Sequence, residues 1–387
     1  MGASTLNVEA AVLRVYGDGA RRDIGLCCPV DYDQQLLKII PNDVLERDYG
    51  CGDPTRHVAA GETVLDLGSG SGKSVYIMSQ VVGREGRVIG VDMNDEMLAL
   101  ARGAQVQFQA NGGPDNVRFG KARIQDLRLD LELADSFLAA HPVRTMADLA
   151  VAEAHFADLR TRVPLVADAS VDVVVSDCVL NLVRPADKVM LFQEIHRVLR
   201  PGGRAVISDI VCDEDVPDRL QQDPELWAGC VSGAMREDHF LQAFEAAGLY
   251  GIEVVARTPE PWQTVEGIEF RSVTVIAYKG KEGACLDGKQ AVIYRGPFKE
   301  VRDDDGHVFP RGVRVAVCRK TFNLYAKAPY RRHVDLVGPR VAVPESELRP
   351  FPCGEGMLVR APRETKGEGY RETTAASFVC GVGGACC

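Results

Sequence analysis

Three cysteines of this chain stand in loops beside apolar segments. Cys178 closes VDVVVSDC, a valine run typical of a buried strand. Cys51 stands in RDYGCGD and Cys230 in LWAGCVSGA. A residue at the carboxyl end of a parallel strand lies where α/β proteins hold their ligands. If the three thiols converge, they form the soft donor set that a thiophilic metal or metalloid requires.

A glycine-rich turn indicates a nucleotide-type ligand. VLDLGSGSG, residues 64–72, runs from a strand into glycines at a predicted helix start, where the backbone admits a ligand and offers free N–H groups. VIGVD ends at Asp92, about 20 residues after Gly72, where a carboxylate can accept both ribose hydroxyls. The pattern is GSGSG rather than GxGxxG, which suits a cofactor without a pyrophosphate.

The elements that must position these groups alternate between strand and helix from residue 61. Strands are predicted at ETVLDLG, GRVIGVD, VRFGKARI, VDVVVSD and GRAVISDIV, with helices between them and two closing strands, GIEVVA and SVTVIAY. This order predicts an α/β fold with a doubly wound, Rossmann-like sheet. A helical insertion at 127–163 is split in two by Pro142.

Composition shifts along the chain predict four regions. Residues 1–60 form an N-terminal helical cap that carries cysteines, and residues 61–283 form the main domain. Residues 284–355 contain short apolar runs that predict a small β-rich C-terminal domain. The segment 356–387 is polar and Gly-rich and ends in CGVGGACC, so we expect a flexible tail.

The GSGSG turn, with Asp66 just before it, resembles that of class I S-adenosylmethionine methyltransferases. The resemblance implies S-adenosyl-L-methionine as cofactor, with the glycine turn along its methionine and ribose and Asp92 on its ribose hydroxyls. It also brings the methyl acceptor to the loop that contains Cys178. Tyr49 is placed to face the sulfonium with its ring. The expected cofactor residues are Tyr49, Asp66, Gly68, Ser69, Gly70, Gly72, Asp92, Met93, Ile124 and Gln125.

Three motifs around this core, YGCG, SDCVLNL and LWxxCxxGA, resemble the arsenite methyltransferase family, from about Tyr16 to about Pro350. The resemblance implies methylation of arsenite and then methylarsenite, with a thiol reductant, glutathione or thioredoxin, as co-substrate. It implies that Cys51, Cys178 and Cys230 are catalytic and bind arsenic(III). A fourth arsenic ligand is expected in LCCP, from Cys27 or Cys28, with Cys28 favoured. The 127–163 insertion and the wording LCCPVDYD depart from the family pattern.

Bulk composition limits the kinds of partner and the cellular compartment that we expect for the protein. The net charge of −10 argues against a nucleic-acid or membrane-surface partner, and no segment has the pattern of a signal peptide or membrane span. Twelve cysteines without a CxxC or zinc-like spacing favour reduced thiols in the cytoplasm. We expect a cytoplasmic monomer acting on a small molecule.

Several other interpretations of these residues stay open at this stage. Each cysteine taken alone is as often a small buried hydrophobe, which is the expectation for Cys212 and Cys318. The three loop cysteines and one more thiol would also suit a structural zinc site. A methyltransferase for another metalloid or a small organic acceptor, or a metalloid-binding protein without activity, would share parts of the pattern.

Overall fold

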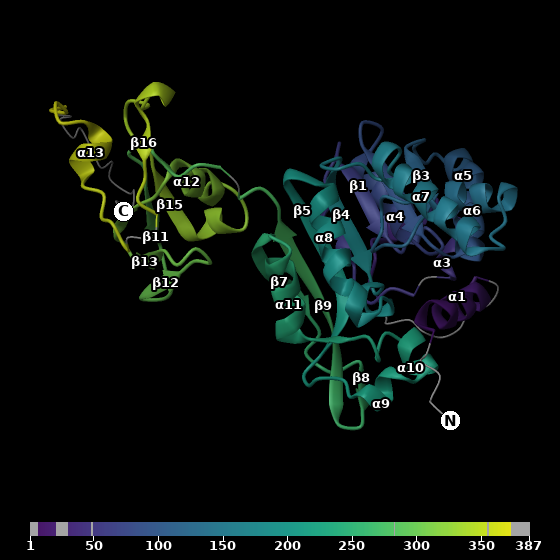
Figure 1. The fold of residues 1–387 in the computed structure, drawn as a ribbon. Helices are drawn as coiled ribbons and strands as arrows, with labels where there is room; N and C mark the ends of the chain where they lie inside the picture. The colour runs from purple at the N-terminus through teal and green to yellow at the C-terminus, as the bar shows by residue number, and fades with distance from the viewer. Residues whose placement is uncertain (1–6, 21–29, 48, 282, 354–355, 373–387) are drawn as a thin grey trace. The chain divides into compact units, whose positions relative to one another are not determined.

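The structure is a computed structural model that describes residues 7–20, 30–47, 49–281, 283–353 and 356–372. The chain forms two compact units, residues 1–280 and residues 281–387 (Figure 1). The expected cap, residues 1–60, belongs to the first unit together with the predicted main domain. The boundary between the units lies close to the expected one at 283/284.

A single twisted sheet forms the centre of the first unit, with strand order β3-β2-β1-β4-β5-β9-β7. The first five strands of this order run parallel, and β9 is antiparallel to both β5 and β7. The strands are β1 (Thr63–Leu67), β2 (Arg87–Asp92), β3 (Val117–Lys121), β4 (Val171–Asp177), β5 (Leu199–Cys212), β7 (Tyr250–Arg257) and β9 (Ile268–Tyr278), while β6 (Met235–Arg236) pairs with β5 and β8 (Gln263–Val265) with β9. The predicted doubly wound sheet is confirmed.

Helices cover both faces of this sheet, which explains why its strands are almost continuously apolar. Along β4, Val173 and Val175 pack on one face, with α4 and α5. Val171 and Val174 pack on the other face, with α8 and α11. The helices are α4 (Lys73–Val82), α5 (Asp95–Ala110), α8 (Lys188–Val198) and α11 (Glu237–Ala246).

The insertion folds into the two expected helices, α6 (Leu131–Ala140) and α7 (Met146–Arg162). Pro142 lies in the link between them, and α7 begins at a capping box formed by Thr145 and Asp148. Phe137 stacks on His155 across the pair, with ring centroids 4.0 Å apart.

The N-terminal cap consists of short helical segments and one longer helix. The segments around Pro41 form single turns, and α1 is the longest element of the cap. The cap elements are α1 (Val8–Gly19), α2 (Gln34–Leu37), α3 (Asn42–Leu45) and η1 (Pro54–His57), and further along the chain follow η2 (Leu180–Leu182), η3 (Pro185–Asp187), α9 (Asp218–Gln221) and α10 (Pro224–Ala228).

The second unit is β-rich, as predicted, and its strands are short. The sheets have the orders β14-β11-β15, β10-β16 and β12-β13. Their elements are β10 (Leu286–Asp287), β11 (Ala291–Tyr294), β12 (Glu300–Arg302), β13 (Val308–Pro310), β14 (Arg314–Ala316), α12 (Arg319–Tyr325), η4 (Tyr330–His333), β15 (Val334–Val337), η5 (Glu345–Glu347) and β16 (Arg349–Pro350).

The expectation of a flexible tail from residue 356 is wrong for residues 356–372. Val359 bridges to Val315, and the helix α13 (Pro362–Lys366) follows. The Arg360 side chain is 8% exposed and pairs with Asp287 at 2.6 Å and Glu364 at 3.0 Å. The polar composition of this segment gave no sign that it is ordered, because a buried guanidinium, rather than an apolar face, attaches it to the rest of the second unit. Cys380, Cys386 and Cys387 lie outside the described residues.

Replacing Arg360 by alanine should therefore destabilise the second unit. The two carboxylates keep some contact with water, so the loss of their charged hydrogen bonds should lower the free energy of unfolding by about 2 kcal/mol. Calorimetry on the full chain measures the shift of the transition of the second unit. Arg363→Ala, on the exposed side of α13, is the matched control, and an equal shift in both variants would contradict the buried role of Arg360.

Candidate active site

A cleft opens at the carboxyl ends of β1, β2 and β4, where the strand order reverses. It encloses about 1090 Å³ of free space, including its open mouth. Every expected cofactor residue lines it except Gly72, which lies behind the turn as the N-cap of α4. The expected residues in its wall are Tyr49, Asp66, Gly68, Ser69, Gly70, Asp92, Met93, Ile124 and Gln125, together with Cys178.

The glycine turn brings the backbone of β1 against the loop that follows β4. Gly68 has a φ of +72°, and a Cβ there would lie 2.4 Å from a methyl group of Val179. Only glycine combines this left-handed backbone with so close an approach. The turn is thus packed against Val179, the residue that follows Cys178. This contact places the glycine turn next to the loop that carries the Cys178 thiol.

Polar groups in the cleft suit a ribose-bearing ligand. The Asp92 carboxylate accepts hydrogen bonds from the N–H groups of Gly70 at 2.9 Å and Asn94 at 2.8 Å. Burial raises the pKa of Asp92, and these bonds oppose that shift. The buried Ser69 hydroxyl has no hydrogen-bond partner among the described residues. A buried polar atom without a partner calls for one, so this wall fits S-adenosylmethionine.

Helix α1 covers the cleft, although the sequence pattern did not mark it as part of the site. Val12 and Tyr16 line the cleft, and both pack with Trp227 of α10. The Tyr16 hydroxyl donates to the Ala228 carbonyl at 3.1 Å, and its ring meets that of Tyr49 edge-on at 5.8 Å. The apolar residues of α1 recur at helical spacing, and this signal could have identified the helix from the sequence.

The three predicted thiols converge beside this cleft. Cys51, Cys178 and Cys230 are buried in one cluster, and Cys178 lies within hydrogen-bonding reach of the other two thiols. The Cys230 thiol also donates to the Cys178 carbonyl at 3.2 Å. Hydrogen bonds with Cys230 and Cys51, with burial, raise the pKa of Cys178, and burial raises the pKa of Cys51. These two thiols are therefore protonated at neutral pH.

The Asp177 carboxylate at the end of β4 holds the loop of Cys51 in place. Its Oδ1 accepts the N–H groups of Cys51 at 2.9 Å and Gly52 at 3.1 Å. The Ser272 hydroxyl donates to the Cys51 carbonyl at 2.6 Å. A Cβ on Gly50 would lie 2.1 Å from Asp177 Oδ2, so the loop can approach the carboxylate only with glycine at that position.

Cys178 and Cys230 share a strained backbone. Both have a φ of +61°, a left-handed conformation that costs a non-glycine residue about 1–2 kcal/mol. Hydrogen bonds hold both in place, from Cys178 N–H to the Ser208 carbonyl at 2.8 Å and from Cys230 N–H to the Trp227 carbonyl at 3.0 Å. Such outliers persist where the surroundings enforce them, and they gather at functional sites.

Two buried charged side chains, Lys188 and Asp209, connect the loops that carry Cys178 and Cys230. The sequence pattern did not mark these side chains as part of the site. Lys188 donates to the Gly233 carbonyl at 2.5 Å and to Asn181 Oδ1 at 3.3 Å, while Asp209 accepts the Leu180 N–H at 2.8 Å. Burial lowers the pKa of Lys188 to about 8 and raises that of Asp209 to about 6. The loops after β4 and α10 are thus joined through one polar network.

The expected ligand Cys28, like Cys27, lies outside the described residues. No residue of the 127–163 insertion belongs to the lining of the cleft in the described part of the chain.

Comparisons with known proteins agree with this fold. A methyltransferase domain model matches residues 59–150 and 139–248, and the model of a domain of unknown function matches residues 281–370. Fold and match together define a methyltransferase. The arsenite methyltransferase of Aquipseudomonas alcaligenes is 33% identical over 322 residues, which cover 78% of this chain and 81% of that protein. The chain belongs to the arsenite methyltransferase family, as the sequence motifs indicated.

Two further relatives extend these comparisons. The arsenite methyltransferase of Mus musculus is 30% identical over 75% of this chain and 70% of that protein. The crystal structure of an arsenic(III) S-adenosylmethionine methyltransferase from Chlamydomonas reinhardtii covers 82% of this chain and 99% of that one, with a TM-score of 0.55 and 24% identity, which shows a shared fold. Within the described residues, no helix has the length and apolar character needed to cross a membrane.

Asp92→Ala should weaken S-adenosylmethionine binding at least about tenfold. Two ribose hydrogen bonds to a charged acceptor, each contributing about 1.5–3 kcal/mol, are lost, with partial compensation by water. Titration calorimetry measures the change, and arsenite binding should be nearly unaltered. Asp95→Ala, an exposed carboxylate in the first turn of α5, controls for charge. Unchanged cofactor affinity in Asp92→Ala would contradict the proposed ribose contact.

Proposed function

We propose that this protein methylates arsenite, and then methylarsenite, with S-adenosyl-L-methionine as methyl donor. The observation that carries the proposal is the double placement of Cys178, which lines the cofactor cleft and also reaches the thiols of Cys51 and Cys230. A substrate held by these three sulfurs lies next to the cleft wall. The names of the relatives point to the same substrate.

Neutral thiols suit the neutral form of the substrate. Arsenous acid has three hydroxyl groups, and each exchanges for a cysteine sulfur as the thiol proton leaves with hydroxide as water. Three such exchanges release three waters and no net proton. The raised pKa values of Cys51 and Cys178 therefore do not oppose binding, and no ion is left without a partner in the buried cluster.

Catalysis on bound arsenic then rests on positioning. Trivalent arsenic with three sulfur ligands keeps a lone pair, so the nucleophile carries no proton and needs no general base. When bound, S-adenosylmethionine supplies an electrophilic methyl group. The strained Cys178 and the anchored Cys51 fix the direction of the lone pair, and orientation of this kind lowers barriers by up to about 7–11 kcal/mol. The Tyr49 ring lines the same cleft, where it could stabilise a positive sulfonium.

Electron balance supports the proposed thiol co-substrate. An arsenic atom that uses its lone pair to form an As–C bond passes formally from the trivalent to the pentavalent state. Two electrons must return to it before it can bind thiols again, and two cysteine thiols that form a disulfide supply them. An external dithiol or glutathione must then reduce the disulfide, so we place the protein in the reducing cytoplasm. The roles of Cys28 and of a monomeric state stay predictions.

The three cysteines should differ between the two methylation steps. Methylarsenite has only two exchangeable positions, because its As–C bond does not exchange, so one thiol becomes dispensable. Cys178 and Cys230 are joined directly by a hydrogen bond, whereas Cys51 comes from the N-terminal cap. We expect Cys51→Ser to lose methylation of arsenite and keep that of methylarsenite, and Cys178→Ser and Cys230→Ser to lose both.

Product speciation from each substrate with purified variants measures this. Cys212→Ser is the matched control, since Cys212 is a buried thiol of the same apolar cluster and contacts the Ala234 carbonyl; it should keep both activities. Full arsenite activity in Cys178→Ser would refute the assignment of the site. Equal loss of both substrates in Cys51→Ser would refute only the order of release. A protein that binds arsenite but not S-adenosylmethionine in calorimetry would be a metalloid-binding protein instead.

A further inference from the structure

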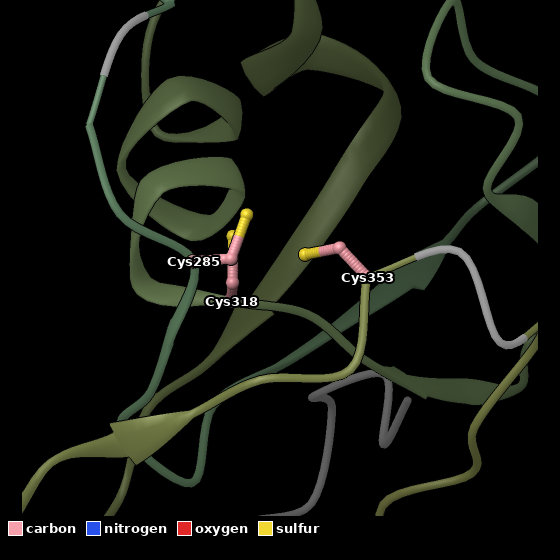
Figure 2. Close-up of side chains that lie close together, drawn as sticks. All are labelled: Cys285, Cys318 and Cys353. Carbon is pink, nitrogen blue, oxygen red and sulfur yellow. The ribbon is translucent and has the colours of Figure 1, made fainter.

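Three other cysteines converge in the second unit. The sulfur atoms of Cys285, Cys318 and Cys353 all lie within 4.8 Å of one another. Figure 2 shows the Cys353 side chain pointing toward those of Cys285 and Cys318. The sequence pattern treated Cys318 as a core residue and gave no role to the other two, since more than 30 residues separate each from the next.

The strand pair β10-β16 brings two of these cysteines together. Cys285 immediately precedes β10, and Cys353 is the third residue after β16. The Phe351 N–H donates to the Cys285 carbonyl at 2.8 Å, which continues the pairing of the strands, and the Cys353 N–H turns back onto the Phe351 carbonyl at 2.8 Å. This tight turn directs the Cys353 sulfur toward Cys285.

Cys318, the third cysteine of the cluster, is the N-cap residue of α12. It is buried against Phe351 and Ala316, with Cys285 packed on the same cluster. Thr321 donates its backbone N–H to the Cys318 sulfur at 3.4 Å, and its hydroxyl lies 3.3 Å from that sulfur. Burial raises the pKa of Cys318, but these hydrogen bonds and the neighbouring thiols outweigh it, so its pKa lies below the ordinary value.

Hydrophobic packing does not account for this arrangement. Cys318 is buried, Cys285 is half-buried and Cys353 is exposed. A thiol placed only to fill a core would not be exposed to water. The exposed Cys353 instead places one thiol of the cluster in contact with water, where a ligand that arrives from solution can meet it.

We propose that Cys285, Cys318 and Cys353 form a second thiol site, which binds trivalent arsenic. Three sulfurs complete the coordination of arsenic(III), whereas structural zinc almost always takes four ligands. Among the described residues, no fourth Cys, His, Asp or Glu ligand atom joins the group. Three thiolates on Zn²⁺ would also leave a net negative charge, whereas three sulfurs on arsenic(III) give a neutral product.

Binding at this site follows the same exchange as at the first site. Three As–O bonds break, three As–S bonds form, and each thiol proton leaves in a water molecule, so no oxidant or reductant takes part. The choice of arsenic rests on the proposed function, but the site uses none of the residues of the cofactor cleft. It would capture the substrate of the enzyme on a separate unit of the chain.

The two sites can be counted separately in the full chain. In a background where the five cysteines outside the described residues are serine, arsenite is added under a phosphine reductant, and arsenic and zinc per chain are measured by mass spectrometry after gel filtration. We expect two arsenic atoms per chain, one in Cys353→Ser, one in Cys178→Ser and none in the double variant. Cys212→Ser should keep two.

Cys353 is the residue to replace because it is exposed, so the Cys353→Ser variant should fold. The thermal unfolding transition of the variant verifies this. Its loss should weaken the second site about 100-fold or more, since changes to groups merely adjacent to a metal site already cost about 10–100-fold. Affinity should be nearly the same from about pH 6 to 8, whereas zinc binding releases protons and would strengthen with pH.

The outcomes separate this proposal from the first one. Two arsenic atoms retained in Cys353→Ser, or only one in the background protein, would overturn the second site. Zinc in the purified protein that disappears with Cys353→Ser would make the cluster a zinc site and overturn it too. Loss of a single equivalent only in Cys178→Ser would leave the cleft as the one arsenic site. Failure of methylation by the unsubstituted chain, with two arsenic atoms bound to it, would instead refute the proposed function.

Discussion

The Asp177 carboxylate holds the active site together. It stands where β4 ends, beside Cys178, and it binds two backbone N–H groups of the loop that contains Cys51. Together with the bond from the Ser272 hydroxyl to the Cys51 carbonyl, this contact attaches the loop of the N-terminal cap beside the thiol at the end of the strand. The requirement for glycine at position 50 follows from it, because a Cβ would collide with the same carboxylate. The Asp177 side chain therefore contacts the sheet, the cap and the thiol cluster at one point.

Other parts of the site adopt conformations and environments that are unfavourable in free energy when considered locally. Cys178 and Cys230 adopt left-handed backbone conformations, and Lys188 and Asp209 are charged groups withdrawn from water. Both features are unfavourable by themselves and persist because hydrogen bonds from several elements enforce them. A site that must keep three sulfurs pointed at one atom benefits from this rigidity, since free thiol loops would have to be ordered by the substrate.

The two thiol clusters differ in ways that suit different tasks. The cluster beside the cleft is buried among apolar residues such as Ile210, Ile268 and Phe270, as a reactive centre shielded from water requires. The cluster of the second unit grades from a buried to an exposed thiol. Its surroundings favour capture from solution, and it contains no group of the cofactor cleft. Under the two proposals, the same donor chemistry occurs once in a buried setting beside the cofactor cleft and once in a setting that reaches the surface.

The sequence by itself determined the sheet, the cofactor turn and the first set of thiols. Valine runs, helical spacing and GSGSG are local signals, because strand and helix periods and turn geometry are expressed within a few residues. Which segments meet is not a local property. The contact of Asp177 with Cys51, the cover that Tyr16 provides, the burial of Arg360 and the approach of Cys353 to Cys318 each join residues far apart in the chain. Only the tertiary structure decided these contacts, since they depend on loop paths and on buried charges for which composition and periodicity give no signal.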